Sequence, residues 1–325
     1  MSPVLRLAWR PWAFRLARPL RTARGTLEVR QGWLLRLEAP DGRVGWGEAA
    51  PLAADPAPLG RSLAALGREP SRAALEGALP ALAPALAFAL GAALAEIEGL
   101  VGAGGWRPAP PPALLLPAGG AALPALESVL ALEGVADPGG WAEPTVKWKV
   151  AAGPDTRERR LLEELLERLP AGARLRLDAN GGWDRETAAS WAERLAGEPR
   201  LQWLEQPLPP EDLEGLRRLA ERLPVALDES LAQRPELRER WEGWQVRRPS
   251  QEGDPRPLLA DLQAGRPRLA LSTAFETGIG ARWLAHLAAL QAAGPTPAAP
   301  GLAPGWCPGG PLFAADPLRV WEAAG

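Results

Sequence analysis

Cysteine, histidine and lysine are scarce in this chain of 325 residues, and tyrosine is absent. The one cysteine, Cys307, excludes a disulfide framework and a cysteine-based zinc site. The one histidine, His286, excludes a metal site built from several histidines and an obvious Ser-His triad. Because His286 stands in an apolar helical stretch, we expect it to be packed rather than catalytic.

Lysine is the most informative shortage. Only two of the 37 basic residues are lysines, and they stand two positions apart in Val146-Lys147-Trp148-Lys149-Val150. Arginine replaces lysine on a solvated surface at little cost, but it cannot supply a removable proton. A strand with two exposed lysines is the simpler interpretation, but it does not explain why only these two escaped replacement. We therefore predict that Lys147 and Lys149 are functional.

The net charge, the apolar stretches and the N-terminal sequence bear on the partners and the location of this protein, while its oligomeric state stays open. The net charge is −2, so we expect neither nucleic acid nor an anionic membrane surface as a partner. Residues 79–95 are uncharged, but Pro80 and Pro84 interrupt them and Glu96 follows, which favours a buried helix over a membrane span. The first residues lack the layout of a signal peptide and the single cysteine fits a reducing cytosol, so we expect a cytoplasmic protein.

The chain divides into an α+β unit and a longer repeating part. Strands are predicted over 33–38 and 44–47, around an Asp-Gly turn, with helices near 58–67, 70–77 and 84–101. A proline-rich connector at 106–112 predicts a boundary, so the first unit covers residues 1–110. The segment from 304 to 325 is too irregular for a further repeat, and we expect it to return to the first unit.

Residues 111–303 alternate between short apolar strands and helices. This alternation implies a parallel sheet, and seven or eight such units imply a (β/α) barrel of the TIM type. The predicted strands cover 113–117, 145–150, 175–179, 202–206, 225–229, 244–248 and 269–274, and the predicted helices include 155–168, 184–196, 210–222 and 279–292.

Three consecutive strands of the predicted barrel end in a carboxylate: Asp178, Glu205 and Asp228. Active sites of such barrels lie at this end of the strands. Three carboxylates in a partly dry site repel one another unless a cation lies between them, and an all-oxygen donor set favours Mg²⁺. Capping of the following helices would explain one of these acids, but not three beside a lysine-bearing strand. The sequence therefore predicts a magnesium site.

The two lysines should lie on the same face, because side chains alternate along a strand. Neighbouring ammonium groups lower each other's pKa, which would help one of them act as a base. Beside Mg²⁺, this arrangement favours removal of a proton α to a carboxylate, with the metal and the second lysine stabilising the negative charge that develops.

Several motifs occur in the order expected for one known group of enzymes. They resemble the enolase superfamily, in its muconate-lactonizing subgroup, over nearly the whole chain. The motifs are Gly-Trp-Gly-Glu48-Ala-Ala-Pro, Thr-Val-Lys147-Trp-Lys149-Val, Arg-Leu-Asp178-Ala-Asn180-Gly-Gly-Trp, Leu-Glu205-Gln-Pro, Leu-Asp228-Glu229-Ser-Leu and Leu-Ser272-Thr273-Ala-Phe-Glu276-Thr-Gly-Ile-Gly.

The resemblance implies a modified (β/α) barrel with an N-terminal α+β capping domain. It also implies Mg²⁺-dependent syn-dehydration of a small carboxylate, 2-succinyl-6-hydroxy-2,4-cyclohexadiene-1-carboxylate, to 2-succinylbenzoate, a step toward menaquinone or phylloquinone. Carried over by position, Lys149 is the base and later the acid, and Lys147 supports it. The remaining implied roles are metal binding by Asp178, Glu205 and Asp228, support of these ligands by Asn180 and Glu229, and substrate contact by Ser272 and Thr273.

One position departs from the subgroup's pattern. The sixth strand usually ends in Lys-Pro, and this chain has Arg248-Pro249. An arginine cannot act as the second base of a racemase or epimerase, and no third lysine replaces it. Dehydration needs a base on one face only, and a cation opposite can stack against the developing ring. The alternatives are another one-base member of the subgroup, such as a muconate-type cycloisomerase, and a non-catalytic carboxylate-binding barrel.

Overall fold

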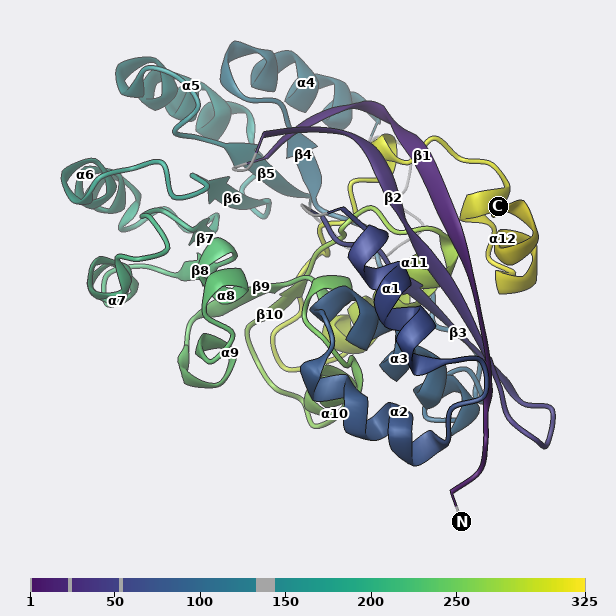
Figure 1. Ribbon diagram of the computed structural model, residues 1–325. Coiled ribbons are helices and arrows are strands. Elements are labelled where there is room, and N and C mark those ends of the chain that lie inside the picture. Colours follow the sequence, from purple (N-terminus) through teal and green to yellow (C-terminus); the bar gives the residue numbers. More distant parts are fainter. Residues whose placement is uncertain (1, 23–24, 53–54, 133–143, 325) are drawn as a thin grey trace.

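The computed structural model describes residues 2–22, 25–52, 55–132 and 144–324 (Figure 1). Its N-terminal part is an antiparallel sheet of β1 (Arg6–Thr22), β2 (Gly25–Glu38) and β3 (Val44–Ala49), in that order. The predicted strands lie within β2 and β3. The sequence pattern does not predict the longest strand, β1, because Pro11 and Pro19 interrupt the alternation of its side chains. The strand forms by pairing with β2.

Helices α1 (Ala57–Leu66), α2 (Arg72–Ala78) and α3 (Pro84–Ile97) pack beside this sheet. The uncharged stretch is the buried helix that its composition predicted, because α3 lies between the sheet and the barrel helices. Gly45 and Gly47 make this approach possible: an added Cβ would lie about 2 Å from carbonyl oxygens of Ala93 and Ala89. No helix in the described part of the chain is long and apolar enough to cross a bilayer.

The second part is the predicted parallel barrel. Seven strands pair in chain order: β4 (Leu114–Leu116), β5 (Thr145–Lys149), β6 (Arg174–Asp178), β7 (Leu201–Glu205), β8 (Val225–Leu227), β9 (Trp244–Arg247) and β10 (Leu269–Leu271). An irregular segment takes the eighth place between β10 and β4. Gly301 N donates to Leu271 O at 2.8 Å, and Ala113 N donates to Pro300 O at 2.9 Å.

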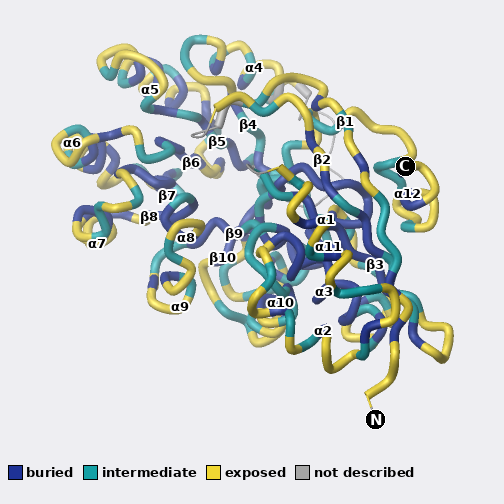
Figure 2. Tube along the Cα trace, in the orientation of Figure 1, coloured by how far each residue is buried: buried dark blue, intermediate teal, exposed yellow. Residues whose placement is uncertain are grey.

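Helices cover the outside of the barrel (Figure 1). They are α4 (Ala122–Leu132), α5 (Asp155–Arg168), α6 (Arg185–Leu195), α7 (Leu213–Ala220), α8 (Glu229–Gln233), α9 (Leu237–Arg240), α10 (Arg256–Gln263) and α11 (Gly278–Ala292). Figure 2 shows the buried residues concentrated in the strands and in α3, with exposed residues along the outer helices. An apolar cluster that includes Trp203, Val246 and Ala298 joins β7, β9 and the irregular segment between β10 and β4.

The last helix, α12 (Pro317–Ala323), packs against the antiparallel sheet. Its Val320 and Trp321 share a cluster with Trp12, Leu34 and Trp46. This contact agrees with the expected return of the C-terminal segment, while the domain limits at 110 and 303 stay predictions.

Candidate active site

The ends of β5, β6, β7 and β8 bring both lysines and all three predicted metal carboxylates into one cluster. The strands are in register there: Lys149 is opposite Asp178, and Asp178 is opposite Glu205. Asp228 follows the end of β8 directly. The three acids are 2%, 1% and 7% exposed, so their charges must be compensated within the protein.

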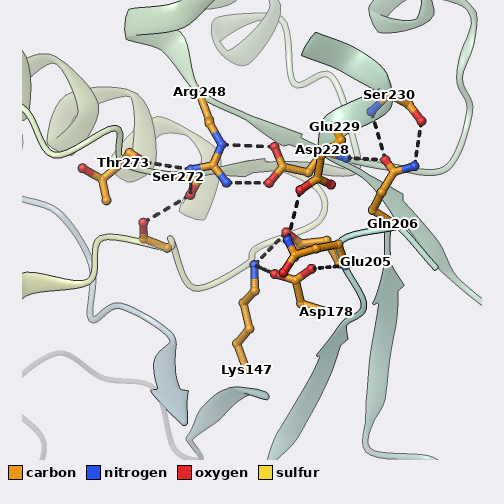
Figure 3. Close-up of polar contacts among 12 residues, drawn as sticks. Lys147, Asp178, Glu205, Gln206, Asp228, Glu229, Ser230, Arg248, Ser272 and Thr273 are labelled. Atoms are coloured by element: carbon orange, nitrogen blue, oxygen red, sulfur yellow. Dashed lines mark hydrogen bonds and ion pairs between the residues drawn. The ribbon is translucent and has the colours of Figure 1, made fainter. Parts of the chain in front are cut away.

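Lys147 lies between two of these carboxylates (Figure 3). Its Nζ is 2.8 Å from Asp178 Oδ2 and 2.6 Å from Glu205 Oε1. Burial lowers the pKa of Lys147, but the charges of Asp178, Glu205 and Asp228 outweigh burial and raise it above its usual value. The expected lowering of this pKa by the second ammonium group is therefore wrong for Lys147, which stays charged.

Lys149 meets a different environment. Its Nζ donates to the neutral Oδ1 of Asn180 at 3.0 Å, and Asn180 Nδ2 donates to Glu229 Oε1 at 3.0 Å. Asn180 has a left-handed backbone with a φ of 46°, which asparagine tolerates better than most residues. The single asparagine of the chain thus connects the predicted base to Glu229.

Glu229 carries an unsatisfied atom. Its Oε2 is shielded from solvent and has no hydrogen-bond partner in the described residues. Burial and the neighbouring Asp228 and Asp178 raise the pKa of Glu229 to about 7, while the bond from Asn180 opposes the rise. Negative charge is thus in excess on this side of the site.

Arg248 follows β9 and reaches the carboxylates from the side opposite Lys147 (Figure 3). Its Nε donates to Asp228 Oδ1 at 3.1 Å and its Nη2 donates to Asp228 Oδ2, which makes a two-point ion pair. Burial lowers the pKa of Arg248, but Asp228 outweighs it, so the guanidinium stays protonated. Arg248 is placed to supply a fixed positive charge.

The two predicted substrate contacts lie beside Arg248. Arg248 Nη1 donates to Ser272 Oγ at 3.2 Å and to Thr273 O at 2.8 Å. The Thr273 hydroxyl donates to Glu276 Oε2 at 2.6 Å, so Glu276 holds the Thr273 side chain in place. Contact of Ser272 and Thr273 with a substrate stays a prediction.

The chemistry of the acidic residues suits a divalent cation. They offer only oxygen donors, and burial together with Asp178 and Asp228 raises the pKa of Glu205, as expected for carboxylates that repel one another. As the side chains stand in the described part of the chain, no three acidic, histidine or cysteine residues are arranged to hold an ion. Lys147 and Arg248 hold the carboxylate oxygens instead, and a bound ion would compete with these contacts.

Two buried residues that support the site were given no role in the sequence interpretation. Gln206 Oε1 accepts from the backbone N–H groups of Asp228 and Ser230 at 3.2 and 3.0 Å, and so fixes the end of β8 (Figure 3). Glu158 accepts from three successive N–H groups that begin at Ala151, just after the lysine strand. A polar residue directly after a strand end was the available signal for Gln206; none marked Glu158.

An antiparallel sheet beside a parallel barrel, with paired lysines facing strand-end carboxylates, defines a protein of the enolase type. The family described as enolase C-terminal domain-like matches residues 134–242. The o-succinylbenzoate synthase of Thermosynechococcus vestitus is 35% identical over 303 residues, covering 87% of this chain and 88% of the relative. The chain therefore belongs to the o-succinylbenzoate synthase family of the enolase superfamily, as its motifs predicted.

Two further comparisons support and limit this assignment. The crystal structure of o-succinylbenzoate synthase from Thermosynechococcus elongatus BP-1, complexed with Mg in the active site, superposes with a TM-score of 0.81 at 31% identity and covers 98% of this chain and 99% of that one. A chloromuconate cycloisomerase from Pseudomonas sp. is 35% identical over only 88 residues, or 26% of this chain and 24% of the relative. The match to the cycloisomerase is thus confined to one segment.

Proposed function

We propose that this chain is an Mg²⁺-dependent dehydratase that converts 2-succinyl-6-hydroxy-2,4-cyclohexadiene-1-carboxylate to 2-succinylbenzoate in the cytoplasm. The observation that carries the proposal is the asymmetry of the site. Lysines face the carboxylates from one side, and the charged Arg248 faces them from the other. Similarity to the o-succinylbenzoate synthase relatives over most of the chain supports the same reaction.

Asp178, Glu205 and Asp228 would hold the metal ion, with Asn180 and Glu229 supporting them. Bound there, Mg²⁺ supplies positive charge against the charge that develops on the substrate carboxylate. Lys147 adds a second positive charge on the same side, because its ammonium group lies beside Asp178 and Glu205.

Lys149 is the proposed base and acid. Its amine takes the proton α to the substrate carboxylate, and the C–H electron pair moves toward that carboxylate. The pair returns to form the new double bond of the ring when the hydroxyl departs with its own bonding electrons. The hydroxyl on the neighbouring carbon then leaves from the same face, and Lys149 returns the proton to it, so that water and an aromatic product form. Asn180 Oδ1 orients the Lys149 Nζ for this exchange.

Arg248 restricts the chain to one-sided chemistry. Racemisation through two bases needs a second group that releases a proton on the opposite face, and an arginine held by Asp228 cannot do so. A positive group at this place can instead stack against the ring as it becomes aromatic.

The test is turnover of the cyclohexadiene carboxylate by the Mg²⁺-loaded protein, followed by the absorbance of the aromatic product. We expect turnover by the wild type, none after Mg²⁺ is removed with a chelator, and loss of at least a thousandfold in Lys149→Arg, which keeps the charge but not the base. Racemisation of N-acylated amino acids without dehydration would contradict the proposal. Lys149→Arg with a tenth of wild-type activity would remove Lys149 from the role of base.

A further inference from the structure

Glu276, in the turn after β10, is a buried carboxylate that is linked to Arg248 indirectly, through Ser250 and through Thr273. It is 3% exposed. Its Oε1 accepts from Ser250 Oγ at 2.6 Å, and Ser250 stands two residues after Arg248 in the short turn η3 (Pro249–Gln251). Its Oε2 accepts from Thr273 Oγ1 at 2.6 Å, and the Thr273 carbonyl accepts from the Arg248 guanidinium. One carboxylate therefore connects to both the backbone and the side-chain end of Arg248.

The turn that carries Glu276 is held in an unfavourable conformation. Phe275 has a φ of 62°, which is uncommon for a bulky residue. The Thr273 hydroxyl accepts from Phe275 N at 2.7 Å, and Glu276 Oε1 accepts from Ala274 N at 2.9 Å. These internal bonds fix the turn beside Arg248, and both of them depend on Glu276 or on the hydroxyl that it binds.

A second buried carboxylate, Glu48 of β3, fixes the helix that follows. It accepts from Thr277 N at 2.9 Å, from Thr277 Oγ1 at 2.6 Å and from Gly280 N at 2.9 Å, at the start of α11. A Cβ on Gly280 would lie 2.7 Å from Glu276 Cβ and 2.9 Å from Glu48 Oε2, so the two glutamates and the helix are tightly packed. The antiparallel sheet thus helps to determine where Glu276 lies.

We infer that Glu276 is a positioning residue for Arg248, and that Glu48 holds it in place from the antiparallel sheet. This inference rests on the proposed function only for the consequence of misplacing Arg248. Arg248 is a long side chain that must face both Asp228 and the substrate ring, and its free rotamers are numerous. The Thr273 carbonyl holds the guanidinium directly, and Ser250 ties the turn that follows Arg248 to Glu276, so these two links restrict where the side chain can lie.

The test combines Glu276→Gln with Arg248→Met in a double-mutant cycle of kcat for dehydration. Glutamine keeps the shape of Glu276 but cannot accept all three bonds. We expect Glu276→Gln alone to lower kcat tenfold to a hundredfold, and to change kcat less than twofold when Arg248 is already methionine. An effect of Glu276→Gln that stays equally large in the Arg248→Met background would overturn the inference, as would wild-type kcat in the single variant.

Glu96→Gln is the matched control, since Glu96 is also a mostly buried glutamate that binds α11, through Arg282 and Trp283, away from Arg248. We expect it to change kcat by the same small factor with either residue at 248. Ser250→Ala gives a gentler variant if Glu276→Gln does not fold.

A readout independent of turnover separates this inference from the proposed function. The Nε–H signal of Arg248 in ¹⁵N NMR spectra, assigned with Arg248→Lys, should exchange slowly with water in the wild type and at least tenfold faster in Glu276→Gln. Unchanged exchange would refute positioning even if dehydration is observed. Faster exchange without any dehydration would refute only the proposed reaction.

Discussion

The two lysines occupy the same face of one strand, yet their surroundings give them different properties. Lys147 contacts two carboxylates and stays charged, while Lys149 contacts the amide oxygen of Asn180. The difference comes from one residue, because Asn180 accepts from Lys149 and donates to Glu229. At the scale of the residue, the amide of Asn180 therefore decides how the proposed base, Lys149, is held.

We predict that Asn180→Asp lowers kcat tenfold to a hundredfold without unfolding the protein. Aspartate tolerates the left-handed backbone, but it cannot donate to Glu229 and would place two carboxylates together. Steady-state kinetics and circular dichroism measure the two effects. Full activity in this variant would show that the bond to Glu229 is not needed.

At the scale of the element, the start of α11 packs so closely against its neighbours that two of its positions have room only for glycine. Its first turn receives the Glu48 carboxylate, which places negative charge at the helix N-terminus where unpaired N–H groups gather. Gly278 also has no room for a side chain, since a Cβ would lie 2.0 Å from Ala314 O. The start of α11 is thus fixed by contacts with β3 and with the C-terminal segment.

Two helical glycines should respond in opposite ways to alanine. Gly280→Ala should lower the free energy of unfolding by about 1–3 kcal/mol, because its Cβ would overlap Glu276. Gly77→Ala, in α2, has no atom within 4 Å of the new Cβ and should raise that free energy by about 0.5–1 kcal/mol. Urea unfolding of both variants checks this, and equal effects would contradict the packing described for α11.

At the scale of the whole molecule, buried glutamates connect the antiparallel sheet and its helices to the barrel. Glu48 extends from β3 to α11, and Glu96 extends from α3 to the same helix. Burial raises the pKa of each to about 7; hydrogen bonds from Thr277 oppose the rise most in Glu48, and the charge of Arg282 opposes it most in Glu96. The contact between the two parts should therefore respond to pH near neutrality.

The direction of this response follows from proton binding. A glutamate has a pKa near 4.5 when unfolded, so between pH 4.5 and 7 folded Glu96 keeps a proton that the unfolded chain has lost. Stability from this group is then present at low pH and is lost as pH rises toward 7, by about 3 kcal/mol. We expect the free energy of unfolding of the wild type, relative to Glu96→Gln, to fall by most of this amount, roughly 2–3 kcal/mol, from pH 5 to 8. A difference that does not change with pH would contradict the shift.

Much of the fold followed from local patterns. Alternation of apolar strands with helices predicted the parallel barrel, and α5 covers the predicted residues 155–168. Two elements could not be predicted in this way. The strand β1 contains prolines, and the segment that closes the barrel near Gly301 has no strand pattern, so only pairing with distant partners defines them.

The sequence by itself determined which groups are available: two lysines on one strand face, acids after three consecutive strands, and an arginine where a second base would stand. Only the tertiary structure decided which other groups these side chains contact. Glu48 and Thr277 are 229 positions apart in the chain and are joined by a hydrogen bond. Charge and hydrogen bonding depend on distance through space and on burial, which spacing along the chain does not fix. The surroundings of Lys147, Lys149 and Glu276 therefore differ in ways that their motifs alone do not specify.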